Sequence, residues 1–351
     1  MRIFMWLADY SGCGYYRCLL PGAELAKRGH DVMADGRVVP NEAKNGECDV
    51  IVGQRICLEG ASVTWQKLAR AGHSKLVFET DDLLTDVDPS NRYAAQFYDA
   101  DTVRRYRENM AVADVITVTT DRLAEQAREI NPFAQIRVLP NQVPAWLLEH
   151  ERFAPMVPGL LATRWTGPVP AHLDPEQVTI GWRGGPSHSR DFGELARPLR
   201  QFLQHPDNRD RAELHCMGAD YTPRVATRHG RARWTGWHES VGDFLRAVDF
   251  DLAVIPLRPS AFNDAKSDLA LVEMSALGVP AIVSAAGPYG RAAEDGAPCR
   301  LAATAKDWTA ALADLVNDAE ARVQLGKQAR EWATGRTIEA NVHRWEEAYS
   351  S

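Results

Sequence analysis

The chain has 351 residues, of which 45% are hydrophobic and 25% charged, a composition that is ordinary for globular proteins. This composition excludes a disordered chain, a collagen and a small disulfide-rich scaffold. The 47 acidic and 40 basic residues give a net charge of −7, which argues against a protein whose main task is binding nucleic acid. At roughly 150 residues per domain, the length predicts two domains.

The membrane, signal-peptide and cysteine patterns of the sequence all indicate the same compartment, the cytoplasm. No apolar run approaches the ~20 residues of a membrane-spanning helix, so we expect no transmembrane segment. The chain begins with a strand-like run that lacks a basic region and a cleavage site, so we expect no signal peptide. The six cysteines are scattered and form no CxxC pair, which indicates free thiols in a reducing compartment. These features predict a cytoplasmic protein.

The first part of the chain alternates short apolar runs with amphipathic helical patterns. Such alternation is typical of βαβ units around a parallel sheet. The predicted strands are residues 3–8, 49–53, 75–79, 115–119 and 136–139, and the predicted helices are residues 17–28, 61–71, 102–113 and 121–130. We therefore expect a Rossmann-like domain over residues 1–155.

A second Rossmann-like domain is predicted after a segment rich in proline and glycine, residues 156–176, which we interpret as a linker. The predicted strands are residues 178–182, 212–217, 232–235, 251–256 and 281–284, and the predicted helices are residues 191–204, 241–248, 267–277, 308–316, 319–333 and 338–349. The domain is expected over residues 177–335, with a terminal helical segment over residues 336–351. Because parallel sheets bind ligands beyond the carboxyl ends of their strands, we expect the site in a cleft between the domains.

The loop after the first predicted strand, Gly12-Cys13-Gly14-Tyr15-Tyr16-Arg17, leads into a helix. Its two glycines allow the backbone to approach a ligand, and a helix start attracts anions. Arg17 stands where a dinucleotide-binding loop has its third glycine. The sequence therefore favours a phosphate or substrate loop over a dinucleotide site, with a tight turn packed on the sheet as the alternative.

Adjacent carboxylates, Asp81 and Asp82, follow the strand predicted at residues 75–79. Such a pair is costly unless it is solvated, paired or functional. It could bind a hydroxylated substrate, act as a general base or hold a metal. Asp86 and Asp88 follow, but no histidine or cysteine lies among them, so a solvated acidic loop is favoured over a metal site.

Two loops of the second domain suit a diphosphate. Residues 181–188 combine flexible glycines with Arg183 and polar caps, a pattern that suits a diphosphate. An ordinary turn between a strand and a helix is the alternative. Lys266 and Ser267 lie where a helix is predicted to begin, which is a natural phosphate site. Glu273 lies seven residues beyond Lys266, on the same predicted helix face, where it can accept hydrogen bonds from ribose hydroxyls. A solvated, charged surface helix is the alternative.

The order of these motifs resembles that of retaining, nucleotide-sugar-dependent glycosyltransferases of the GT-B fold. The resemblance rests on the 181–188 loop, Thr235-Gly236-Trp237, the 251–256 strand and Lys266-Ser267…Glu273…Gly278-Val279-Pro280. It implies two Rossmann-like domains that face a cleft, with the sugar donor in the second and the acceptor in the first. It also implies retention of anomeric configuration, no metal, no cofactor, and a C-terminal helix that crosses back to the first domain.

The resemblance also implies roles for individual residues. Those expected to bind the sugar donor are Gly12, Gly14, Gly184, Gly185, His188, Trp237, Asn263, Lys266, Ser267 and Glu273. Those expected to bind the acceptor are Tyr15, Tyr16, Arg17 and Asp82, and those expected to be catalytic are Asp81, Asp82, Arg183 and Lys266. One departure is Ala265, which stands where many relatives have the first of two glutamates.

Several functions remain open at this point. The acceptor could be a glycan, a lipid-linked sugar, a small molecule or, as in bacteriophage-type enzymes, a hydroxylated DNA base; the locally basic segment 183–233 is compatible with DNA. A sugar-nucleotide epimerase could use the same fold, and Ala265 favours an inactive nucleotide-sugar-binding protein. A dehydrogenase is opposed by Arg17 in the first loop.

Overall fold

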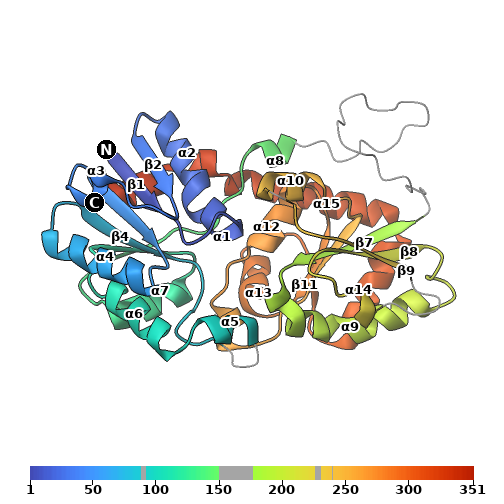
Figure 1. Ribbon diagram of the computed structural model, residues 1–351. Coiled ribbons are helices and arrows are strands. Elements are labelled where there is room, and N and C mark those ends of the chain that lie inside the picture. The colour runs from blue at the N-terminus through green and yellow to red at the C-terminus, as the bar shows by residue number, and fades with distance from the viewer. Residues whose placement is uncertain (88–91, 150–176, 226–230, 239) are drawn as a thin grey trace.

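The computed structural model describes residues 1–87, 92–149, 177–225, 231–238 and 240–351. The predicted linker, residues 156–176, and Asp88 lie outside the described residues. The described chain forms two α/β halves, each built on a six-stranded sheet with helices on its faces (Figure 1). All strands pair in parallel. The prediction of two tandem Rossmann-like units is therefore confirmed.

The first sheet has the strand order β2-β1-β3-β4-β5-β6. Its strands are β1 Arg2–Trp6, β2 Asp31–Asp35, β3 Val50–Gln54, β4 Lys75–Thr80, β5 Val115–Val118 and β6 Gln135–Val138. The helices of this half are α1 Gly12–Gly14, the π-helix η1 Tyr15–Leu19, α2 Leu20–Lys27, α3 Asn41–Lys44, α4 Glu59–Ala71, α5 Arg92–Phe97, α6 Ala100–Met110, α7 Asp121–Ile130 and α8 Trp146–Glu149. Ile3, Phe4 and Met5 of β1 are fully buried, as expected of a central strand covered on both faces.

The second sheet has the strand order β12-β11-β10-β7-β8-β9. Its strands are β7 Val178–Gly184, β8 Ala212–Gly218, β9 Arg231–Thr235, β10 Leu252–Ile255, β11 Ala281–Ser284 and β12 Arg300–Ala302. The helices are η2 Pro186–His188, α9 Ser189–Gln204, η3 Thr222–Arg224, α10 Val241–Arg246, α11 Ala261–Asp264, α12 Leu269–Ala276, α13 Gly287–Glu294, α14 Ala305–Asn317 and α15 Ala319–Ala333.

Strand order reverses beside β1 in the first sheet and beside β7 in the second. From β1 the chain adds β2 on one side and β3 on the other, and from β7 it adds β8 on one side and β10 on the other. Such reversals open a crevice at the carboxyl ends of the two central strands. The loops after β1, β3, β7 and β10 are therefore the ones that the fold places at ligand-binding positions.

The end of the chain returns to the first half through η4 Thr334–Arg336, α16 Ile338–Asn341 and α17 His343–Ser350 (Figure 1). Glu346 of α17 accepts hydrogen bonds from Arg28 at 2.8 Å and forms a contact of 3.0 Å with His30. Lys75 of β4 donates to the carbonyl oxygen of Tyr349 at 3.1 Å. These contacts confirm the predicted crossing of the C-terminal helix to the first half.

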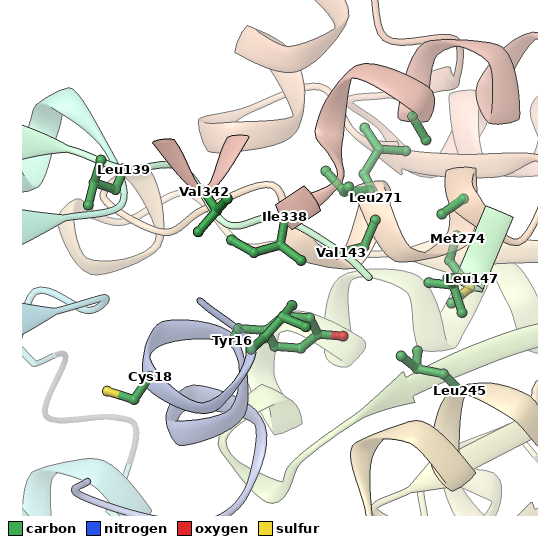
Figure 2. Packing of buried hydrophobic residues seen from close by; sticks show 14 of the residues in the cluster. Tyr16, Cys18, Leu139, Val143, Leu147, Leu245, Leu271, Met274, Ile338 and Val342 are labelled. Atoms are coloured by element: carbon green, nitrogen blue, oxygen red, sulfur yellow. The ribbon is translucent and has the colours of Figure 1, made fainter. Parts of the chain in front are cut away.

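A continuous apolar cluster joins the two halves and the returning segment (Figure 2). Tyr16 comes from the first half, Leu245 and Met274 from the second, and Ile338 from the returning segment. Tyr16 and Ile338 are at most 3% exposed. Because these side chains are buried against one another, the two halves pack as one core here.

Candidate active site

The carboxyl edges of the two sheets face each other. Asp82, which follows β4, contacts Lys266, which follows β10, with 3.3 Å between Oδ1 and Nζ. Thr120, which follows β5, donates a hydrogen bond of 2.9 Å to the carbonyl oxygen of Ala265. The loops that follow β4 and β5 of the first sheet thus meet the loop that follows β10 of the second.

Lys266 is the cation at the centre of this region. Its side chain is 21% exposed, and its Nζ lies 4.7 Å from the centroid of the Phe262 ring. Burial alone would lower the pKa of Lys266, but the neighbouring Asp82 carboxylate raises that pKa above its usual value. The ammonium is therefore charged, and one of its faces is shielded from water by an aromatic ring.

The predicted helix start at Ser267 is wrong by two residues. Residues 261–264 form their own short helix, α11, and the chain turns before α12 begins at Leu269. Lys266 and Ser267 lie in this turn, so they do not share a helix face with Glu273. Both residues nevertheless stay close to the N-terminal end of α12, where the helix dipole favours anions.

Glu273 is buried in α12 and has partners from both halves. The hydroxyl of Tyr16 donates to its Oε1 at 2.5 Å, and the guanidinium of Arg183, at the end of β7, forms an ion pair with its Oε2. Glu273 is 2% exposed, and burial lowers the pKa of Arg183. The predicted residues Arg183, Glu273 and Tyr16 are thus brought together, and a ribose that bound Glu273 would share or replace one of these partners.

Arg55 and Asp9, which carry no sequence motif, lie beside Asp81. Arg55 follows β3, and its φ of +47° is the only positive value among the described residues other than glycine. Its guanidinium pairs with Asp9, and its Nε lies 3.9 Å from Oδ1 of Asp81. Burial pushes the pKa of Asp81 upward, but Arg55 brings it below its ordinary value. The strand-end rule that selected Asp81 would also have selected Arg55.

Arg17 is in the core and not in the cleft, so its predicted contact with the acceptor is wrong. Its side chain is fully buried, with Nε 2.7 Å and one terminal nitrogen 3.1 Å from the two carboxylate oxygens of Glu79. The other terminal nitrogen donates to the carbonyl oxygen of Leu139 at 2.7 Å and to Oδ1 of Asn141 at 3.0 Å. Each of the three guanidinium nitrogens thus has a partner inside the first half, and Arg17 ties η1 to β4 and to the residues after β6.

The glycine loop after β1 is a tightly packed turn at one of its two glycines. A Cβ at Gly14 would lie 1.8 Å from the carbonyl oxygen of Asp9, so no other residue fits there. A Cβ at Gly12 would meet nothing within 4 Å. Only Gly12 therefore leaves room for a ligand. Tyr15 is half-buried, and its ring centroid lies 5.0 Å from that of Tyr16.

In the second half, the loop after β7 is linked to α11 through Asp191. Oδ2 of Asp191 lies 2.9 Å from Nδ1 of His188, and its Oδ1 accepts a hydrogen bond of 2.9 Å from the Asn263 amide. A Cβ on Gly184 would lie 3.2 Å from the His188 ring, and the neighbouring Gly185 is half-buried. His188 and Asn263 are thus brought together at Asp191, with Gly184 beside the His188 ring.

Trp237 forms an exposed aromatic surface beside the same loop. Its ring stacks on Phe244 with 4.8 Å between centroids and is 58% exposed. Gly218 has a φ of +95°, and a Cβ there would lie 2.9 Å from the Trp237 ring. A Cβ on Gly185 would lie 3.8 Å from the same ring. The glycines allow the indole to lie close to the carboxyl edge of the sheet.

A cavity of about 350 Å³ lies beyond the ends of β10 and β11. Its polar lining residues include Arg258, Ser260, Asn263 and Asp264. Its size suits a monosaccharide-sized ligand.

Among the described residues, His, Cys, Asp and Glu form no group of three that could hold a metal ion. In the same part of the chain, no helix is both long and apolar enough to cross a membrane.

Comparison with solved structures shows which fold this architecture has. No family model matches the sequence, and no curated protein sequence does. Among solved structures, HepE from Anabaena in complex with UDP-glucose is similar over 100% of both chains, with a TM-score of 0.67 and 14% identity. Sucrose-phosphate synthase from Thermosynechococcus elongatus is similar over 100% of this chain and 98% of its own, with a TM-score of 0.66 and 15% identity. The chain has the GT-B fold.

A third GT-B structure, the lipopolysaccharide glycosyltransferase WaaG, covers 100% of both chains with a TM-score of 0.63 and 12% identity. These similarities confirm the predicted fold. In the GT-B frame, the first half holds Asp81, Asp82 and Arg55, and the second half holds Arg183, Lys266 and Glu273.

Proposed function

We propose that this chain is a glycosyltransferase that moves a sugar from a nucleoside-diphosphate sugar to an acceptor hydroxyl. One observation carries the proposal: two cations of the second half, Arg183 and Lys266, lie at the carboxyl edge of its sheet, and Lys266 meets Asp82 of the first half. The second half thus presents cations that can bind an anion, and the first half presents a carboxylate opposite them. HepE, which shares the fold, has been solved with UDP and with UDP-glucose, which supports UDP as the nucleotide.

The chemistry follows from the charges. When the bond between the anomeric carbon and the phosphate oxygen breaks, negative charge grows on the departing diphosphate. Lys266 and Arg183 supply positive charge there, and fixed charges in a partly buried site stabilise such a transition state strongly. In this proposal the two cations make a metal ion at the diphosphate unnecessary.

The acceptor hydroxyl forms the new bond to the anomeric carbon, and its proton passes to the departing phosphate oxygen. Because that oxygen lies on the face where the new bond forms, the configuration is retained. Asp81 and Asp82 orient the acceptor by accepting hydrogen bonds from its other polar groups, because the single proton of the reacting hydroxyl passes to the phosphate oxygen. Asp81 suits this task, since Arg55 holds its pKa below the ordinary value and keeps it ionised.

The donor sugar is assigned to the cavity lined by Asn263 and Asp264. Ala265, which replaces a glutamate of the resembling enzymes, is fully buried and packs in a cluster formed mainly by first-half residues. It offers a sugar no polar group from its side chain. Asn263, whose amide is oriented by Asp191, and Asp264 precede Ala265 directly and line the cavity, so they are the candidate replacements.

A nucleotide-sugar-binding protein without transferase activity is the second candidate, and Ala265 is the observation that favours it. Incubation with UDP-sugars and a panel of glycans, lipid-linked sugars, small molecules and hydroxymethylated DNA, analysed by mass spectrometry, separates the two. Transfer of one sugar mass to an acceptor supports the proposed enzyme. Tight binding of UDP-sugars with neither transfer nor hydrolysis supports the binding protein. Isomerised UDP-sugar without acceptor would indicate an epimerase instead.

A further inference from the structure

The carboxylates Asp81 and Asp82 differ in where their cationic partners come from. Asp81 faces Arg55 of its own half, at 3.9 Å. Asp82 contacts Lys266 of the other half, at 3.3 Å, and the two side chains are 23% and 21% exposed. Only the second pair joins the halves, and only its cation is also a proposed phosphate ligand.

Asp82 and a phosphate would compete for the same ammonium. One side of Lys266 is covered by the Phe262 ring at 4.7 Å, which limits the directions from which an anion can approach. An Asp82 carboxylate and a phosphate held together at one ammonium would repel each other, since like charges at close range are costly in a partly buried site. A diphosphate at Lys266 therefore favours separation of Asp82 from it.

We propose that Asp82 is an internal counter-ion of Lys266 which the diphosphate of the sugar donor displaces. This inference rests on the proposed function and assigns Asp82 an additional role. Displacement frees the Asp82 carboxylate in the first half, where the acceptor hydroxyl is expected. Asp81 keeps its partner Arg55 throughout, because that partner belongs to the same half. The donor therefore binds before the acceptor, and the same carboxylate serves both steps.

The test is calorimetric titration of UDP into the full chain and its variants. Asp82→Asn keeps the size of the side chain but removes the competing charge, so it should bind UDP about two- to tenfold more tightly than the wild type. Asp82→Glu keeps the charge and should bind near the wild-type value. Asp101→Asn is the matched control for net charge, since Asp101 forms an exposed pair with Arg104 in the first turn of α6.

A mutant cycle isolates the contact. In a Lys266→Ala background, Asp82→Asn should no longer tighten UDP binding, because the ammonium for which the anions compete is absent. Equal or weaker UDP binding by Asp82→Asn, or the same gain in the Lys266→Ala background, would overturn the inference while leaving the proposed function intact. Absence of UDP binding by the wild type would instead overturn the UDP-sugar donor and this inference with it.

Discussion

Replacing Tyr16 with phenylalanine tests the contact that links the halves at Glu273. The substitution removes one oxygen, and that oxygen donates to Oε1 of Glu273 at 2.5 Å. Tyr16 is 3% exposed and Glu273 is 2% exposed, so water cannot readily replace the lost donor. Hydrogen bonds to charged groups contribute about 1.5–3 kcal/mol, and we expect Tyr16→Phe to lower the free energy of unfolding by that amount.

Urea denaturation followed by circular dichroism measures the effect. Tyr10→Phe is the matched control, because the Tyr10 side chain is 54% exposed and water can take over its hydrogen bonds; it should change stability by about 0.5 kcal/mol or less. Tyr16→Phe should also alter UDP affinity, since Glu273 then keeps Arg183 as its polar partner. A Tyr16→Phe variant as stable as the control would refute the assignment of this contact as a stabilising link.

Three further predictions concern the chemistry. Lys266→Ala should lower kcat more than it raises the KM for the sugar donor, and Glu273→Gln should do the reverse, each by roughly 10- to 150-fold; wild-type kinetics in both would remove the proposed roles. EDTA should leave transfer intact, and a loss that Mg²⁺ or Mn²⁺ restores would contradict metal independence. Arg55→Met should raise the pKa of Asp81, which Arg55 holds below 3.8, and move the acid limb of the pH–rate profile to higher pH. In the wild type, the depressed pKa of Asp81 stabilises the folded state above pH 3.8, and this stabilisation is lost as the pH falls through the folded pKa. Arg55→Met should remove this stabilisation. An acid limb that does not shift would contradict the pairing of Arg55 with Asp81.

The central strands could be predicted because they are continuous buried runs, such as Val50, Ile51 and Val52 of β3. Strands β2 and β12 were not predicted. Both lie at sheet edges, where β2 has exposed or half-buried residues along its length and β12 has three residues. An edge strand needs neither a long apolar run nor strict alternation, so its pattern resembles that of a loop.

The sequence located side chains at the carboxyl ends of strands well, as for Asp82 after β4, Arg183 at the end of β7 and Lys266 after β10. The site was predicted worst where a distant partner decides a side chain's role. Arg17 resembles a ligand-binding residue in its loop, but Glu79, which neutralises it, lies 62 residues away in sequence. Arg55 also follows a strand, but the sequence shows neither its partner Asp9, 46 residues away, nor its left-handed backbone.

The most direct test of the account is thermal melting of the wild-type chain with and without UDP. At about 100 times its dissociation constant, a ligand that binds only the folded state adds about 2.7 kcal/mol of stability. UDP should clearly raise the melting temperature of the wild type, and Lys266→Ala should reduce that rise. No rise with UDP, GDP, ADP, TDP or CDP would contradict the claim that the second half of this GT-B chain binds a nucleoside diphosphate.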